Sequence, residues 1–185
     1  ALSSSLLAAV ALTKKNKNLH KPLILKLSAK EDRKKFNDIL AENNLQVFDT
    51  IREQVVELLK CIRPLNSLVP KDEFNQLVDQ KLGNSNEYGV WVYYPWSNKL
   101  VHLLDEEEFT IVRTNRNKHK ITEKEQEILS SKKIGVIGLS VGQSVSLTLA
   151  MERGFGELRI ADFDELDLSN INRIRTGAQN IGLKK

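Results

Sequence analysis

The sequence is poor in cysteine, and this limits the kinds of site that it can build. Cys61 is the only cysteine among 185 residues, so an intrachain disulfide and a four-cysteine zinc site are both excluded within this sequence. A reducing compartment tolerates such a composition, and we expect a cytoplasmic protein. Cys61 lies beside Leu58 and Leu59 in a stretch with helical spacing. We therefore interpret it as a small buried hydrophobe rather than a nucleophile.

Long hydrophobic runs and long runs of one charge are also missing. Residues 6–12 are apolar, but the run is far shorter than the about 20 residues of a membrane span, so we expect an N-terminal helix there. The 28 basic residues alternate with 24 acidic ones, for a net charge of +4, and we predict neither a nucleic-acid nor a membrane partner. The three histidines lack ligand spacing, and no metal site is predicted from them.

Four lysines near the N-terminus are the main local concentration of charge before residue 22. They fit either a solvated face or contact with an acidic partner, and we favour the solvated face. The lysines are Lys14, Lys15, Lys17 and Lys21.

Glycine and proline divide the sequence near residue 110. All four prolines lie before this point, whereas most of the nine glycines follow it. This shift predicts two domains, which we place at residues 1–108 and 109–185. Because the sequence begins without methionine and ends inside a motif described below, we expect it to be a piece of a longer protein.

The first domain is predicted to be a small α/β domain. Apolar patterning predicts two strands, three helices and a hairpin of two further strands. Their ranges are residues 23–27 and 45–48 for the strands, 29–43, 51–62 and 71–82 for the helices, and 88–94 and 99–104 for the hairpin. The acidic residues 105–108 are interpreted as a surface boundary.

Local sequence signals refine this prediction. Three pairs, each a hydroxyl residue followed three positions later by glutamate, fit capping boxes at helix starts. In the hairpin, alternation places Trp91 and Tyr93 on one strand face, in the core, and Tyr94 on the other. The three pairs are Ser28 with Glu31, Thr50 with Glu53, and Thr122 with Glu125.

The second domain is predicted to open with a βαβ unit. An apolar strand at residues 134–137, a turn at 138–142, a helix at 143–153 and a strand at 158–161 follow one another. This order is that of the first βαβ unit of a Rossmann-like, doubly wound parallel sheet.

The turn and the end of the second strand carry the features of a nucleotide site. A turn with Gly138, Ser140 and Gly142 before a helix lets the backbone approach phosphate, where free amide groups and the helix dipole favour an anion. Asp162 follows the next strand, where a carboxylate can accept hydrogen bonds from ribose hydroxyls. The alternative is that strand, turn and helix are only tightly packed. The pattern alone thus predicts a nucleotide, without naming the reaction.

Residues 162–173 give a more specific indication. Asp162-Phe-Asp164, followed by Ser169-Asn170-Ile-Asn172-Arg173, resembles a motif of the ubiquitin-activating-enzyme-like (ThiF-type) adenylyltransferases. Gly182-Leu-Lys-Lys185 resembles the family's Gly-x-x-Lys, with one residue fewer after Arg173 than the family pattern. The segment from Arg113 to Arg116 is similar to one whose arginine reaches into a partner subunit's site. The resemblance covers about residues 110–185.

The resemblance implies that ATP activates a carboxylate, for which a small acid, a peptide or the C-terminus of a ubiquitin-like protein would each fit. Arg116, Arg173 and Lys185 would be the catalytic cations, and Asp162 would hold the ribose. Mg²⁺ would be held by an aspartate beyond residue 185, and the active form would be a homodimer. Because the site would then be incomplete, residues 1–185 alone are not expected to catalyse adenylation.

Three further side chains of the motif have two interpretations each. Asp164 would bind a sugar hydroxyl or support the loop. Asn170 would donate hydrogen bonds near the phosphates or orient Arg173. Asn172 would contact the ligand or only build a turn, to which asparagine is suited by its local backbone hydrogen bonds.

The glycine turn departs from the family pattern. The family has Gly-x-Gly-Gly-x-Gly, whereas Ser140, Val141 and Gln143 replace three of those glycines here. A branched side chain at Val141 is expected to alter phosphate contact. An alternative function is therefore a nucleotide-binding or scaffold module that keeps the fold without the chemistry.

The sequence also matches parts of the patterns of two other enzyme classes and of one larger architecture. Gly138-Leu-Ser140-Val-Gly142 matches the nucleophile elbow of hydrolases, but all three histidines precede Ser140, against the expected order of the triad. An NAD-dependent oxidoreductase would use Asp162, but it leaves residues 169–173 unexplained. Residues 88–104 and 113–122 also resemble bacterial ThiF-type proteins with an extra N-terminal domain and a downstream nitroreductase-like domain, where flavin would bind.

Overall fold

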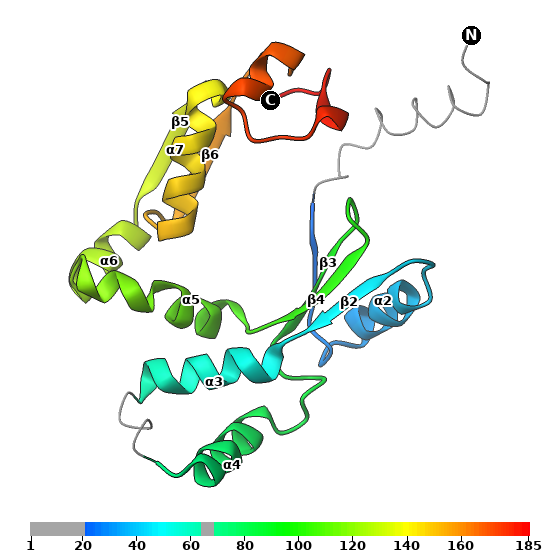
Figure 1. Cartoon of the computed structure of the whole chain (residues 1–185), viewed down its shortest axis with the longest axis vertical. Helices are drawn as coiled ribbons and strands as arrows, with labels where there is room; N and C mark the ends of the chain where they lie inside the picture. Colours follow the sequence, from blue (N-terminus) through cyan, green and yellow to red (C-terminus); the bar gives the residue numbers. More distant parts are fainter. Residues whose placement is uncertain (1–20, 64–68) are drawn as a thin grey trace. The chain divides into compact units, whose positions relative to one another are not determined.

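The computed structural model describes residues 21–63 and 69–185 (Figure 1), and the chain divides between Arg113 and Thr114 into two compact units. The helix expected at residues 6–12 lies outside the described residues. Across the described ranges, no helix combines the length and apolar character that a membrane crossing requires.

The first unit contains a four-stranded mixed sheet in the order β1-β3-β4-β2. β3 (Val90–Tyr94) and β4 (Lys99–Leu103) form the predicted antiparallel hairpin, which is thereby confirmed. β1 (Leu23–Leu25) pairs antiparallel with β3, and β2 (Gln46–Asp49) pairs parallel with β4. The short strands β1 and β2 form the two edges of the sheet.

Helix α2 (Lys30–Leu40) packs on one face of this sheet. The core beneath it contains Trp91 and Tyr93, which confirms that these two side chains share the buried face. Phe36 of α2 lies against Trp91, with ring centroids 5.2 Å apart. The other buried members of this cluster are Leu25, Leu27, Ile39 and Leu100.

A second core forms where α3 (Ile51–Ile62) and α4 (Lys71–Leu82) pack together beside Leu104, the residue after β4. Val55, Leu58 and Val78 are fully buried in this cluster. Cys61 is half-buried on α3. Both helices were predicted with these bounds, because their apolar residues recur at helical spacing.

Helix α5 (Glu106–Thr114) was not predicted, and residues 105–108, interpreted as a surface boundary, form its start. The Oδ1 atom of Asp105 accepts a hydrogen bond from the backbone amide of Glu108 at 3.0 Å. Acidic side chains in a first turn also interact favourably with the positive end of the helix dipole. The acidic run is therefore a helix start.

Only one of the three predicted capping boxes is present. The side chain of Thr122 accepts from the amide of Glu125, whose carboxylate accepts from the amide of Thr122 at 2.7 Å, at the start of α6 (Glu123–Ser130). Ser28 does not cap α2, whose N-cap is Ala29 without a side-chain bond. At α3, Thr50 is the N-cap, but its hydroxyl accepts from Gln54 instead of capping the backbone. Those two predictions are wrong: the N-cap of α2 lies one residue after Ser28, and Gln54 engages the Thr50 hydroxyl.

The phenol of Tyr93 offers a test of the first core. Burial and a 2.7 Å hydrogen bond to the carboxylate of Glu42 raise the pKa of Tyr93 to about 12. Because the folded pKa lies above the usual value of about 10, the stability from the neutral phenol is present below pH 10 and is lost as the pH rises through 12. Titration followed by phenolate absorbance should show this late transition, and Tyr93→Phe should remove it. A Tyr93 transition at the ordinary value would contradict the buried placement.

The second unit contains the predicted βαβ motif. β5 (Lys133–Ile137) and β6 (Glu157–Ala161) are parallel, with α7 (Leu139–Glu152) between them in sequence. Three short 3₁₀ helices flank it: η2 (Asn115–His119), η3 (Leu168–Asn172) and η4 (Ala178–Asn180). Parallel pairing across an intervening helix is the arrangement of a Rossmann-like α/β fold, which confirms the predicted fold class.

Candidate functional site

The turn before α7 is shorter than predicted. The helix begins at Leu139, directly after Gly138, so residues 139–142 are helical and the prediction of a turn through residue 142 is wrong. Only Gly138 in this segment has positive φ, at 86°, a conformation that side chains rarely adopt. Ser140, Val141 and Gln143 occupy helical positions that do not demand glycine. This explains how the fold accommodates the three replaced glycines.

Gly142 is needed for a different reason, because α7 approaches β5 closely at this point. A Cβ atom built on Gly142 would lie 2.7 Å from Cγ1 of Val136. Gly135, on β5, has nothing within 4 Å of the same constructed atom. The absence of a side chain at Gly142 therefore allows α7 to lie close to β5, and this close approach determines where the first turn of α7 lies.

We expect Gly142→Ala to destabilise the second unit by about 1–3 kcal/mol, the usual cost of overpacking a close contact. Gly135→Ala is the matched control and should change the unfolding free energy by less than about 1 kcal/mol. Denaturant unfolding measures both. In a double-mutant cycle, Val136→Ala should recover part of the Gly142→Ala loss, since it removes the clashing methyl group. Equal losses for the two glycines would contradict the close approach.

Asp162 joins the end of β6 to the start of α7. Its Oδ2 atom accepts from the amide of Leu139 at 2.6 Å, and its Oδ1 atom accepts from the amide of Asp164 at 2.8 Å. The hydrogen bond from Asp164, then that from Leu139, lower the pKa of Asp162, with a smaller contribution from the charge of Lys185. Asp162 is thus an ionised clamp in this structure. A carboxylate has about four acceptor positions, so it retains capacity for ribose hydroxyls.

Lys185 is brought back to the start of α7 by a closed loop. The backbone of residues 164–166 pairs with that of residues 182–185, through Leu166 to Leu183, Gly182 to Leu166 and Lys185 to Asp164. The Nζ atom of Lys185 lies 3.3 Å from Oγ of Ser140 and 3.2 Å from Oδ2 of Asp164. The Lys185 side chain is only 6% exposed. An ammonium group is therefore fixed beside the first turn of α7.

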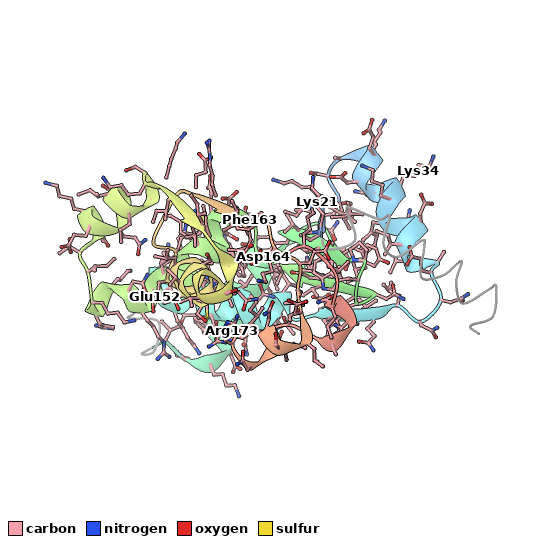
Figure 2. The ribbon with its side chains drawn as sticks, turned by 90° about the horizontal axis from the view of Figure 1, so that it is seen from above. Lys21, Lys34, Glu152, Phe163, Asp164 and Arg173 are labelled. Atoms are coloured by element: carbon pink, nitrogen blue, oxygen red, sulfur yellow. The ribbon has the colours of Figure 1, made fainter. Side chains whose placement is uncertain are left out.

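The remaining motif residues lie on the loop after β6, from which Phe163, Asp164 and Arg173 project in Figure 2. Asn170 is buried, and its Oδ1 atom accepts from the amide of Asp167 at 3.2 Å. The exposed Arg173 donates to Oδ1 of Asn172 at 3.0 Å. In this geometry Asn170 shapes the loop and Asn172 holds the guanidinium, while Arg173 stays accessible to a ligand.

Gln143 helps to shape the candidate site, and the sequence prediction missed it. Its side-chain amide accepts from the amide of Arg175 at 2.7 Å and donates to the Arg175 carbonyl at 3.2 Å. This pair ties the loop that carries Arg173 to the second turn of α7. The only sequence signal was the replacement of a family glycine by a residue whose amide can both donate and accept.

Arg116 lies at the other end of α7. Its neighbour Asn117 donates to the carbonyl of Glu152 at 3.0 Å, and Lys120 forms an ion pair with the same residue at 3.1 Å. Glu152 ends the 14-residue helix, so about 20 Å separates it from the start of α7. Within the described ranges, no hydrogen bond or ion pair engages the exposed guanidinium of Arg116. Arg116 is therefore not brought together with Asp162, Arg173 and Lys185 of its own chain.

The hydrolase alternative gains no support from this geometry. The hydroxyl of Ser140 contacts Lys185, and no hydrogen bond joins it to a histidine in the described part of the chain. Nor do residues 21–63 and 69–185 contain a group of three or more His, Cys, Asp or Glu side chains that could hold a metal ion.

Comparison with known proteins agrees with the resemblance seen in the sequence. Residues 113–185 match the ThiF family, which confirms the predicted family for that segment. The chain is also similar to Uncharacterized protein MT1398 of Mycobacterium tuberculosis (strain CDC 1551 / Oshkosh), with 47% identity over 95 residues. That match covers 51% of this chain but only 13% of the relative's length. No solved structure matches the chain.

Proposed function

We propose that this chain, whose residues 113–185 carry the adenylyltransferase-like nucleotide-binding fold of the ThiF family, contributes an ATP site to an enzyme that adenylates a carboxylate. The observation that carries the proposal is the convergence of Lys185, Ser140 and Asp162 at the start of α7. Free amide groups, a helix dipole and a fixed ammonium group together favour a phosphate at this place.

The proposed reaction is attack by a carboxylate oxygen on the α-phosphorus of ATP. The bond from that phosphorus to the bridging oxygen of the β-phosphate breaks, pyrophosphate leaves with the electron pair, and an acyl-adenylate forms. Negative charge gathers on the attacking, transferred and leaving groups, so cations placed beforehand lower the barrier. Lys185 and Arg173 are the cations that this chain supplies at its own site.

Each side chain has a proposed task that its position supports. Asp162 accepts hydrogen bonds from the ribose while it keeps its bonds to Leu139 and Asp164. Lys185, which has three donor hydrogens and two oxygen neighbours, directs the third to a phosphate oxygen. Arg173, on its exposed loop, makes paired hydrogen bonds to the leaving pyrophosphate.

The proposal is less specific about the carboxylate that is activated and about the metal ion. The carboxylate is a small acid or the C-terminus of a ubiquitin-like protein. Only the second would require a surface that binds a protein. The described residues do not fit a Mg²⁺ site, because they offer no cluster of metal-binding side chains. No step is therefore assigned to a metal ion.

Pyrophosphate exchange tests this function in the full-length protein that contains these residues. We expect exchange that depends on a carboxylate substrate, and a fall of about 100-fold in Lys185→Met, the size seen when one charge-stabilising donor is lost. Lys184→Met is the matched control, because Lys184 is next to Lys185 in the sequence and its side chain is exposed. This variant should retain exchange.

The scaffold alternative predicts a different result from the same samples. It is favoured by the replaced glycines, and it requires ATP binding by calorimetry without exchange for any carboxylate offered. If neither ATP binding nor exchange occurs in the folded protein, the nucleotide site itself is rejected.

A further inference from the structure

The sheet of the first unit has one face that α2 does not cover. Side chains alternate across a strand, so the neighbours of the buried Trp91 and Leu100 face the other way. The strand register aligns Ile24, Val92 and Val101 in one row on that face, which ends at Phe48 on β2. Ile24 is 66% exposed and Phe48 is 45% exposed. An apolar row thus crosses the whole sheet; it is open at both edges, while Val92 in its middle is buried.

A groove runs along this face toward the start of α5. Its volume is about 700 Å³, and its apolar lining includes Ile24, Val92, Leu103 and Phe109. We call this the α5 groove. Its size falls in the range of sites that hold a ligand or a short peptide segment.

The rim of the α5 groove is acidic. Asp105, Glu106 and Glu107 line it, against one basic side chain, that of Lys26. Glu106 and Glu107 are exposed, so their charges face outward from the apolar floor. The groove therefore suits a segment that combines apolar side chains with several lysines or arginines.

The sequence immediately before β1 has this composition. Residues 6–12 are uniformly apolar, and Lys14, Lys15, Lys17 and Lys21 follow, with no acidic residue between positions 1 and 30. Lys21 is separated by one residue from β1, whose Ile24 lines the groove. We propose that the segment of residues 6–21 docks in the α5 groove of its own chain, with its apolar run on the sheet and its lysines at the acidic rim.

The short connection strengthens this assignment. A tether of a few residues gives an effective concentration in the millimolar range, so an intramolecular partner competes well against a free one. Nine residues lie between Leu12 and Pro22, and such a stretch spans up to about 30 Å when extended. The run can thus reach the groove beside β1 without distortion of the strand.

Disulfide trapping in the complete chain tests the proposal. In a Cys61→Ser background, Ala9→Cys is combined with Glu107→Cys at the groove, or with Lys34→Cys on α2, which packs on the opposite face. We expect an intramolecular disulfide yield about tenfold higher for the groove pair than for the α2 pair. Adding Ile24→Arg to the groove pair should remove this advantage, whereas Leu23→Arg, on the other face of the same strand, should leave it.

Every other outcome rejects the docking. Equal yields for the two pairs, or a groove yield that is indifferent to Ile24→Arg, overturn it. A disulfide between two chains, seen as a dimer under denaturing conditions, overturns it in favour of a second copy at the groove. Circular dichroism verifies folding, and the comparison of the two cysteine pairs stands even if Ile24→Arg does not fold. No result depends on ATP, so the proposal stands apart from the proposed adenylation.

Discussion

Asp162→Ala is expected to weaken ATP binding by about 100-fold, because the variant loses the charge-assisted hydrogen bonds that we propose Asp162 makes to the ribose. It also removes the acceptors for Leu139 and Asp164, so the start of α7 and the loop after β6 lose their link. Calorimetric titration with ATP measures the affinity, and thermal unfolding reports the structural loss separately.

Leu139→Pro separates the two roles of Asp162. Proline suits the first position of a helix and lacks the amide hydrogen, so this variant deletes the bond to Asp162 while it keeps the carboxylate. We expect it to share much of the thermal destabilisation but to bind ATP within about tenfold of the unchanged protein. If folded Asp162→Ala binds ATP as well as the unchanged protein, Asp162 is only a clamp and the ribose assignment fails.

Complementation between two inactive variants is the second large effect expected. Arg116→Ala and Arg173→Ala should each lower pyrophosphate exchange by roughly 1,000-fold, the scale of an arginine that stabilises transferred phosphate. Because Arg116 lies near Glu152, at the far end of α7 from Lys185, it is proposed to serve the site of a partner subunit. The active full-length form would then be a homodimer.

Mixing the two variants should restore exchange to about one quarter of the original value. Random pairing makes half of the dimers mixed, and each mixed dimer contains one site with both arginines intact. Lys118→Ala is a matched control, since Lys118 is an exposed cation of the same 3₁₀ helix η2 and should not affect exchange. If mixed dimers form but the mixture shows no pyrophosphate exchange, Arg116 does not act across an interface.

The sequence predicted the elements whose apolar spacing is regular. Helices α3 and α4, the β3–β4 hairpin and the parallel pair β5–β6 follow from periodicity, since each must bury one face. The start of α7 did not follow, because a small-residue stretch can form a turn or a helix with equal ease. Here the helix is favoured by Asp162, 23 residues further along the chain, whose carboxylate accepts a hydrogen bond from the amide of Leu139.

The sequence named Asp162 and Lys185, which the structure brings together, but it missed Gln143 and did not predict the arrangement. Its motif pointed to Asp162 and Lys185, whereas the contact between Lys185 and Ser140 needs the loop to return to α7. The two hydrogen bonds between Gln143 and Arg175 likewise need this loop to fold back onto α7. The remote position of Arg116 depends on how η2 packs against the end of α7. Contacts between distant segments of this kind leave no local pattern.

The pairing of residues 164–166 with residues 182–185 also bears on how this protein tolerates insertions and deletions. Both ends of the loop are pinned by backbone hydrogen bonds, so the position of Lys185 is fixed by its pairing with Asp164 rather than by the number of residues between them. Closing a slightly shorter or longer loop changes its entropy only weakly. The spacing between Arg173 and Lys185, one residue shorter than the family pattern, is therefore compatible with a lysine in the same place. Length variation should accumulate around η4, between the pinned ends, while the two paired segments that position the lysine keep their register.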